Sequence, residues 1–341
     1  MHQYDIRDLR IHFPTRRGVV EAVRGVSFYM DQGECVALVG ESGCGKSVTA
    51  RSLMGLTEVT GGRCQPGSQI LCHGENILDY SKKQWQSYRG REAAMIFQDA
   101  MTSLNPTMQI GHQIAECYRF HQKIGRKEAL EKAAEMLALV GISDPETALR
   151  RYPHEFSGGM RQRVMIASAL ACQPGLLIAD EPTTALDVTI QAQILELLKE
   201  MRVKYNLTII LITHDLGVVA NIADRVAVMY AGDIVEIGTS DEIYYDPRHP
   251  YTWALLSSMP QMGVKGEDLF NIQGTPPNLF TEIHGDAFAP RNPLALKIDF
   301  VKRPPYFDVS TTHRAKTWLL DPRAPKIEPP AAVRMLQEEG K

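Results

Sequence analysis

The sequence has no apolar run long enough to cross a bilayer. The longest runs, such as residues 207–213 (LTIILIT), are far shorter than the roughly 20 residues that a membrane-spanning helix needs. The first residues carry charges with no apolar signal-peptide core behind them, so secretion is unsupported. We therefore expect a chain that does not cross the membrane and that works in the cytoplasm.

A basic surplus and a disulfide framework are also missing. The 341 residues include 37 Lys and Arg against 40 Asp and Glu, a formal net charge of −3. Without a basic excess to neutralise a phosphate backbone, nucleic acid is not expected as a partner. The cysteines are scattered and form no CxxC pair, so we expect reduced and mostly buried thiols. They are Cys35, Cys44, Cys64, Cys72, Cys117 and Cys172.

The sequence does contain short apolar runs that alternate with longer stretches of helical spacing, which predicts an α/β domain on a largely parallel sheet. The predicted strands are residues 34–39, 93–97, 176–179 and 207–213. Between the second and the third, Leu130, Ala134 and Leu137 follow helical spacing and predict a helical subdomain inserted into the sheet domain.

The composition changes near Asp246, and residues 259–285 then contain Pro and Gly in a pattern typical of linkers or irregular structure. We therefore divide the chain into three parts. The α/β domain covers residues 1–245, with its helical subdomain at about 99–165, and a small C-terminal extension covers 246–324. Residues 325–341 are expected to form a flexible tail.

A glycine-rich motif stands between a predicted strand and a predicted helix. Residues 40–47 read GESGCGKS and match the GxxxxGK[ST] P-loop. Its glycines let backbone N–H groups wrap phosphate oxygens, Lys46 adds a charge, and the Ser47 hydroxyl can bind Mg²⁺. The alternative, a glycine-rich turn with a solvated lysine, leaves the strand-and-helix context unexplained. The expected nucleotide-binding residues are Gly40, Glu41, Ser42, Gly43, Cys44, Gly45, Lys46, Ser47 and Val48.

Polar residues follow three of the predicted strands at the edge where open α/β sheets bind ligands. In GLLIADE, Asp180 is placed to hold Mg²⁺ and Glu181 to act as the general base that polarises the attacking water. Gln98 is a candidate for catalysis and for Mg²⁺ binding, and His214 for catalysis. Alone, these residues could equally be a solvated acidic turn and ordinary polar loop residues, so their interpretation depends on the P-loop.

A second glycine-rich helix start lies in FSGGMRQR. Ser157, Gly158 and Gly159 would form another N-terminus that receives an anion. Because the first site already has its own cradle, we infer that each nucleotide is shared between two such domains. The alternative is a simple helix cap at Ser157.

Together these motifs resemble the ABC ATPase family. GESGCGKS, the glutamine after MIF, FSGGMRQR, LLIADEP with TTALD, and ITHD occur in the family's order. The resemblance implies a P-loop NTPase fold of the ABC cassette type, which binds ATP and Mg²⁺ and works as an ATP sandwich dimer. In that dimer Ser157 and Gly159 would face the opposite nucleotide, Asp187 would lie in the loop that crosses the interface, and His214 would sense the γ-phosphate. Phe13 is the best candidate for the aromatic ring that stacks on adenine, and a core phenylalanine is the alternative.

Finer features resemble the ATPases of oligopeptide and dipeptide permeases, and most closely the D type. They are QDAMTSLNPTMQIG, RHPYTWALLSSMP and the tail segments GDAFAPRNPLALKIDF and PPYFDVSTTHRAKTWLLDP. The resemblance implies a peripheral subunit on the cytoplasmic face of the cell membrane that energises import. Its partners would be a second ATPase, identical or different, two membrane-spanning permease subunits and, indirectly, an extracytoplasmic peptide-binding protein.

Other interpretations fit the sequence less well. The same subgroup includes importers of nickel and other small solutes, which remain an alternative. A soluble ABC ATPase acting on nucleic acid would carry paired cassettes or a long coiled-coil insertion, and neither is visible. A GTPase or small-molecule kinase would leave FSGG unexplained, and a non-catalytic binding module would leave the intact Asp180, Glu181 and His214 unexplained.

The tail departs from many relatives in one respect. Where they carry four cysteines that bind an iron-sulfur cluster, this chain has Asp286, Asn292, Asp299 and Thr317. We therefore expect no iron-sulfur cluster, and a hydrogen-bonded or solvated polar cluster in its place. The extension should then depend on the packing of four aromatic side chains, Phe288, Phe300, Phe307 and Trp318.

Overall fold

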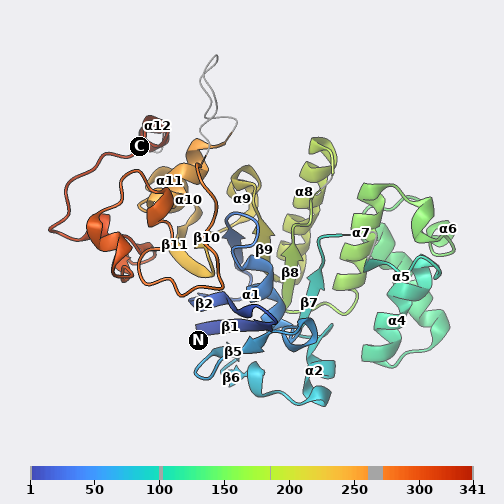
Figure 1. Cartoon of the computed structure of the whole chain (residues 1–341). Coiled ribbons are helices and arrows are strands. Elements are labelled where there is room, and N and C mark those ends of the chain that lie inside the picture. The colour runs from blue at the N-terminus through green and yellow to red at the C-terminus, as the bar shows by residue number, and fades with distance from the viewer. Residues whose placement is uncertain (1, 100–102, 185, 260–271, 340–341) are drawn as a thin grey trace. The chain divides into compact units, whose positions relative to one another are not determined.

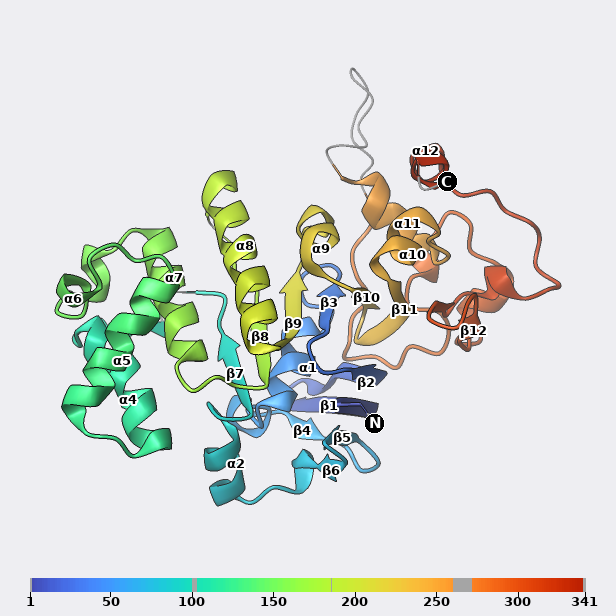
Figure 2. The same ribbon diagram turned by 180° about the vertical axis from the view of Figure 1, so that it is seen from behind.

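The computed structural model describes residues 2–99, 103–184, 186–259 and 272–339 (Figures 1 and 2). Within these residues, no helix combines the length and the apolar character needed to span a membrane. The chain divides into two compact units. The first contains Met1–Tyr29, Cys35–Ile77 and Thr213–Lys341, and the second contains Met30–Glu34 and Leu78–Ile212. The extension therefore shares a compact unit with the P-loop, while the sequence boundaries at 245 and 324 stay predictions.

The first unit contains an antiparallel sheet that the sequence analysis did not foresee. Its strands are β1 (Tyr4–Thr15), β2 (Gly18–Met30), β4 (Arg63–Cys64), β5 (Gln69–Cys72) and β6 (Glu75–Asn76), in the order β2-β1-β5-β6 with β4 also paired to β1. In β1 the alternation of buried and exposed residues slips by one at Asp8, whose φ is 44°. Ile6 and Leu9 are therefore both buried, although three positions separate them.

The first unit also contains the strand that leads into the P-loop. β3 (Cys35–Val39) pairs in parallel with β10 (Arg225–Tyr230), which pairs antiparallel with β11 (Asp233–Thr239). Two short strands of the extension continue this sheet: β13 (Arg314–Ala315) pairs antiparallel with β11, and β12 (Phe307–Asp308) pairs antiparallel with β13. β3 and β10 are buried at every position, which explains their continuous apolar runs.

The helices of the first unit are α1 (Lys46–Leu53), α9 (Leu216–Ile222), α10 (Ser240–Tyr245), α11 (Pro250–Ser257) and α12 (Ala331–Glu339). The tail that was expected to be flexible contains α12, whose Val333 is buried and which packs against α10 and α11 (Figure 1), and its flexibility stays a prediction. The tail carries apolar residues at helical spacing, which gives the helix a face to bury.

The second unit confirms the predicted parallel strands. β7 (Ala93–Ile96), β8 (Leu176–Asp180) and β9 (Thr208–Thr213) pair in parallel, with Ala93 opposite Leu176 and Leu176 opposite Thr208. Its helices are α2 (Lys82–Tyr88), α4 (Ile110–Gln122), α5 (Arg126–Leu139), α6 (Pro145–Ala148), α7 (Gly158–Leu170) and α8 (Val188–Tyr205).

The predicted helical subdomain is also present in the second unit. α4 to α7 lie between β7 and β8 in the sequence and gather together in space (Figures 1 and 2). Of the residues that predicted it, Ala134 and Leu137 are buried and Leu130 is half-buried in α5. Short 3₁₀ helices complete the two units at Glu58–Thr60, Ile77–Asp79, Pro153–Glu155, Ala289–Arg291, Lys297–Phe300 and Trp318–Leu320.

Candidate nucleotide-binding site

The P-loop connects β3 to α1, as its sequence context predicts. Gly40, Gly43 and Gly45 have φ values of 148°, 80° and 103°, which other residues rarely adopt. A Cβ atom on Gly45 would lie 2.6 Å from the carbonyl oxygen of Ala22, whereas one on Gly43 would meet no described residue within 4 Å. Gly45 also precedes α1 as its N-cap, and glycine places no side chain in front of the helix N-terminus. The positive end of α1 is therefore left open to an anion.

Lys46 is folded back onto its own loop. Its ammonium group donates hydrogen bonds to the carbonyl oxygens of Gly40 at 2.6 Å and Glu41 at 2.9 Å, and its side chain is buried. These carbonyls hold the charge at the loop that would surround a phosphate group. The lysine, the glycine turns and the open helix end together fit the phosphates of a nucleotide.

Two of the predicted nucleotide-binding residues line one small cavity of about 100 Å³. Phe13 of β1 and Val48 of α1 face it together with Arg51, Thr57 and Thr60. A Cβ atom on Gly62 would lie 2.8 Å from the ring of Phe13, so this glycine leaves room for the half-buried ring. The structure thus places Phe13 beside the helix that follows the P-loop, and its stacking on adenine stays a prediction.

In the second unit, the structure brings Gln98 and Glu181 together. The Gln98 side-chain amide donates a hydrogen bond of 2.9 Å to Oε2 of Glu181, and the Thr184 hydroxyl donates one of 2.8 Å to the same oxygen. Glu181 has a φ of 48°, and its N–H bonds to the carbonyl of Ile212 in β9. The backbone turn at the end of β8 and two donors therefore fix this carboxylate, while Asp180 is buried at the end of β8.

The second glycine-rich helix start is assembled in the same unit. The Ser157 hydroxyl caps α7 by accepting the N–H of Met160, and Asp187 caps α8 by accepting the N–H of Ile190. A Cβ atom on Gly159 would lie 2.7 Å from the Ile190 side chain, so the two helix starts are side by side. Ser157 is thus a helix cap, which was the alternative interpretation, and its role toward a second nucleotide stays a prediction.

His214 lies directly after β9 and is exposed. It precedes Asp215, which caps α9 by accepting the N–H of Gly217 at 2.8 Å. The predicted role of His214 as a γ-phosphate sensor stays a prediction.

The four side chains at the cysteine positions of the relatives each bond a nearby backbone N–H. Asp286 accepts from Phe288, Asn292 from Leu294, Asp299 from Leu296 and Thr317 from Leu319, at 2.6 to 3.2 Å. All four are buried, and burial raises the pKa of Asp286 and of Asp299. Within the described residues, no group of three or more His, Cys, Asp or Glu side chains could hold a metal ion. Of the two arrangements expected at these positions, hydrogen-bonded or solvated, the four side chains adopt the hydrogen-bonded one.

The aromatic packing of the extension differs in part from expectation. Phe288 and Trp318 are buried and Phe307 is half-buried against Trp318 with ring centroids 6.1 Å apart. Phe300 is wrong as a core residue, because it ends a 3₁₀ helix with 58% of its surface exposed.

The purified chain should carry no stoichiometric iron and show no visible sulfide-to-iron absorption band. Such clusters are held by thiolates, and all six cysteines precede the extension. All six cysteines are described by the structure, and none of them forms a disulfide. Anaerobic purification, iron analysis and visible spectroscopy measure this. Stoichiometric iron with the absorption band would contradict it.

Three residues with contacts at these sites were not foreseen. Thr184 lies in TTALD, three positions after Glu181, a spacing that a turn can close onto the carboxylate. Tyr251 and Arg291 contact the P-loop residue Glu41 from the extension. Both residues lie far from Glu41 in the sequence, so no local motif could predict that they contact the P-loop.

The chain matches known families and proteins over most of its length. Residues 23–184 match the family model described as ABC transporter, and residues 235–298 match the C-terminal region of oligopeptide/dipeptide transporters. The chain is 59% identical over 331 residues to the oligopeptide transport ATP-binding protein OppD of Bacillus subtilis (strain 168), covering 97% of this chain and 92% of that protein. It is 55% identical over 326 residues to the dipeptide transport ATP-binding protein DppD of Lactococcus lactis subsp. cremoris (strain MG1363), covering 95% and 93%.

Solved structures confirm the fold. The dimeric structure of the ABC transporter cassette MJ0796 aligns with a TM-score of 0.62 at 22% identity, over 70% of this chain and 98% of that one. The structure of cbiO1 from Clostridium perfringens, part of the ABC transporter complex cbiONQ, aligns with a TM-score of 0.60 at 26% identity, over 72% and 91%. The chain therefore belongs to the ABC transporter family, as an ATP-hydrolysing, ATP-binding subunit of the oligopeptide/dipeptide transport type.

Proposed function

We propose that this chain hydrolyses MgATP at the cytoplasmic face of the cell membrane and so energises the import of oligopeptides or dipeptides. The observation that carries the proposal is the match over 97% of the chain, extension included, to a protein named for oligopeptide transport. The match of residues 235–298 to the C-terminal region of such transporters supports the same substrate class.

In this proposal the P-loop binds the phosphates of ATP, and the residues at the end of β8 help to hold Mg²⁺ and activate the attacking water. Lys46 leaves the carbonyls of Gly40 and Glu41 and binds the β- and γ-phosphates, while Ser47 and Asp180 hold Mg²⁺. Glu181 accepts the proton of the attacking water, and Gln98 with Thr184 holds its carboxylate in place.

The proposed assembly contains a second ATPase and two membrane-spanning permease subunits. Each nucleotide is bound between two cassettes, and Ser157, Gly158, Gly159 and Asp187 of this chain approach the nucleotide of the other ATPase. The position of these four residues at two adjacent helix starts supports this role. The transported peptide contacts the membrane and binding subunits, because this chain remains on the cytoplasmic side.

Cells in which this chain is replaced by its Lys46→Ala variant should lose uptake of a radiolabelled oligopeptide and keep uptake of nickel. The substitution removes the phosphate-binding charge without changing which solute the membrane subunits select. Both uptake rates are measured in the same cells, with wild-type chain reintroduced as the control. Loss of nickel uptake with normal peptide uptake would instead assign the chain to a metal importer.

A further inference from the structure

The second residue of the P-loop is held from the C-terminal extension. The Glu41 carboxylate accepts two hydrogen bonds from Arg291, one from Nη1 to Oε2 at 2.6 Å and one from Nη2 to Oε1 at 3.0 Å. The backbone N–H of Glu41 donates to the hydroxyl of Tyr251 at 2.8 Å. Both the side chain and the backbone of this loop residue are therefore fixed by the extension.

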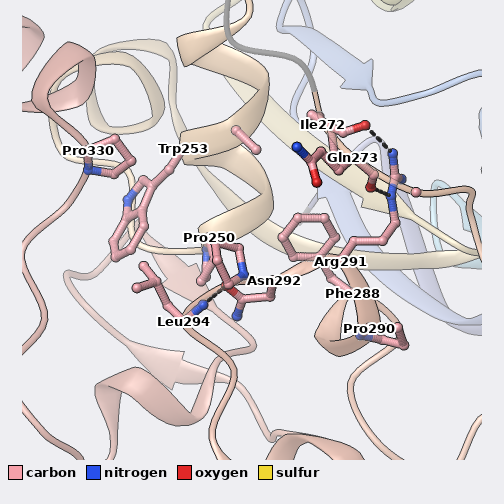
Figure 3. A pocket seen from close by; sticks show the side chains of 13 residues that line it. Pro250, Trp253, Ile272, Gln273, Phe288, Pro290, Arg291, Asn292, Leu294 and Pro330 are labelled. Carbon is pink, nitrogen blue, oxygen red and sulfur yellow. Dashed lines mark hydrogen bonds between the residues drawn. The ribbon is translucent and has the colours of Figure 1, made fainter.

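Arg291 is itself held firmly. Its side chain is only 5% exposed, its Nε donates to the carbonyl of Gln273 at 2.9 Å, and its Nη2 donates to the carbonyl of Ile272 at 3.2 Å. Figure 3 shows the guanidinium at the edge of a cavity of about 880 Å³, turned toward these two carbonyls. Hydrogen bonding to Glu41 raises the pKa of Arg291, so the guanidinium stays charged. A solvated surface pair would show none of these constraints.

Three aromatic rings support the same contact. Tyr230, Tyr251 and Phe288 pack with ring centroids 4.6 to 5.3 Å apart, and the Tyr230 hydroxyl accepts a hydrogen bond of 3.2 Å from Arg291. Two of these residues thus touch the Glu41–Arg291 pair directly, and Phe288 fixes their rings. Rings packed against one another in this way have little room to move, so the Glu41–Arg291 pair is held in one geometry.

The β10–β11 hairpin joins the loop to the extension as well. The N–H of Gly232, in the turn between these strands, donates to the carbonyl of the P-loop residue Cys44 at 2.9 Å. The next residue, Asp233, accepts hydrogen bonds from Lys316 at 2.6 Å and from Arg303, both in the extension. Loop, hairpin and extension therefore form one continuous hydrogen-bonded network.

We propose that Arg291 is a positioning residue for ATP binding: it orients Glu41 so that the N–H groups after it in the P-loop point at the phosphates. The guanidinium fork suits this task, because two parallel hydrogen bonds fix the plane of the carboxylate. The inference rests on the nucleotide site proposed above and gives the extension a role in that site.

A purely electrostatic role would leave a different signature. If Arg291 only neutralised Glu41 near the phosphates, Glu41→Gln would remove the negative charge and tighten ATP binding, and Arg291→Lys would behave as wild type. Under positioning, both substitutions break the paired hydrogen bonds and weaken ATP binding. The sign of the Glu41→Gln effect therefore separates the two mechanisms.

The test measures the dissociation constant of the full chain for a fluorescent ATP analogue with Mg²⁺, at a temperature where circular dichroism shows each variant folded. We expect Arg291→Gln and Glu41→Gln each to weaken binding about tenfold, and the double variant to be no weaker than either alone, since coupled residues act non-additively. Amide hydrogen exchange in residues 41–47 should rise in the same variants before nucleotide is added.

Arg323→Gln is the matched control. Arg323 also forms a paired contact with a carboxylate of the extension, Asp321, but both are near the surface and no P-loop residue takes part. Affinity equal to wild type in Arg291→Gln, tighter binding in Glu41→Gln, or additive losses in the double variant would overturn the proposal. Lys46→Ala tests the nucleotide site separately from the positioning role of Arg291, because ATP binding retained in that variant would overturn the nucleotide site itself.

Discussion

Replacing Glu181 with Gln should lower the rate of ATP hydrolysis by about 100-fold or more, because the amide cannot accept the proton of the attacking water. The substitution keeps the size of the side chain and its acceptor oxygen for Gln98 and Thr184. MgATP affinity should therefore stay close to that of wild type. Phosphate release at saturating MgATP and nucleotide affinity are measured on the same preparation.

Thr184→Val provides the matched control for this result. It removes the Thr184 hydrogen bond to the Glu181 carboxylate and keeps the base, so hydrolysis should fall much less than in Glu181→Gln. Turnover of Glu181→Gln close to that of wild type would remove Glu181 from the role of general base. A loss of nucleotide affinity as large as the loss of turnover would assign it to binding instead.

Replacing Gly158 with Asp should abolish the MgATP-dependent association of two cassettes, weakening it about 100-fold or more because like charges across an interface cost several kcal/mol. In the proposed assembly, the new carboxylate would face the phosphates of the other subunit's nucleotide. Sedimentation with MgATP, in the Glu181→Gln background that is expected to retain ATP, measures association of this chain with itself and with the proposed second ATPase.

The structure makes Gly158 a cleaner choice for this test than Gly159. Among the described residues, a Cβ atom on Gly158 would meet the Leu186 side chain at 3.6 Å, an ordinary contact, whereas one on Gly159 would press on Ile190 at 2.7 Å. An acidic residue in the first turn of α7 also favours the helix. Gly158→Ala is the matched control and should associate normally. Association of Gly158→Asp equal to that of the Ala variant would contradict the shared-nucleotide arrangement.

Much of the sheet could be predicted because its strands are buried on both faces. The runs that became β3, β7, β8 and β9 are continuous and largely apolar. The antiparallel sheet of β1, β2, β5 and β6 was not predicted from the sequence, because its strands mix buried and exposed residues and β1 loses its alternation at Asp8. Such irregular alternation gives no clear period.

The candidate site divides in the same way. The P-loop and the helix start at Ser157 are contiguous in the sequence, and their glycine spacing follows from local backbone geometry. The contact of Gln98 with Glu181 joins residues 83 positions apart, and that of Arg291 with Glu41 joins residues 250 apart. Pairing of this kind is decided by tertiary packing, so one sequence alone carries no sign of it.

The polar residues at the cysteine positions also bear on how quickly the extension folds. Each of Asp286, Asn292, Asp299 and Thr317 bonds an N–H within three residues of itself. Contacts this local close on fast timescales and carry little loop-closure entropy, unlike a cofactor that ties distant segments together. These four turns can therefore close early, while the rest of the extension still depends on distant partners, such as β11 for β13 and Glu41 for Arg291.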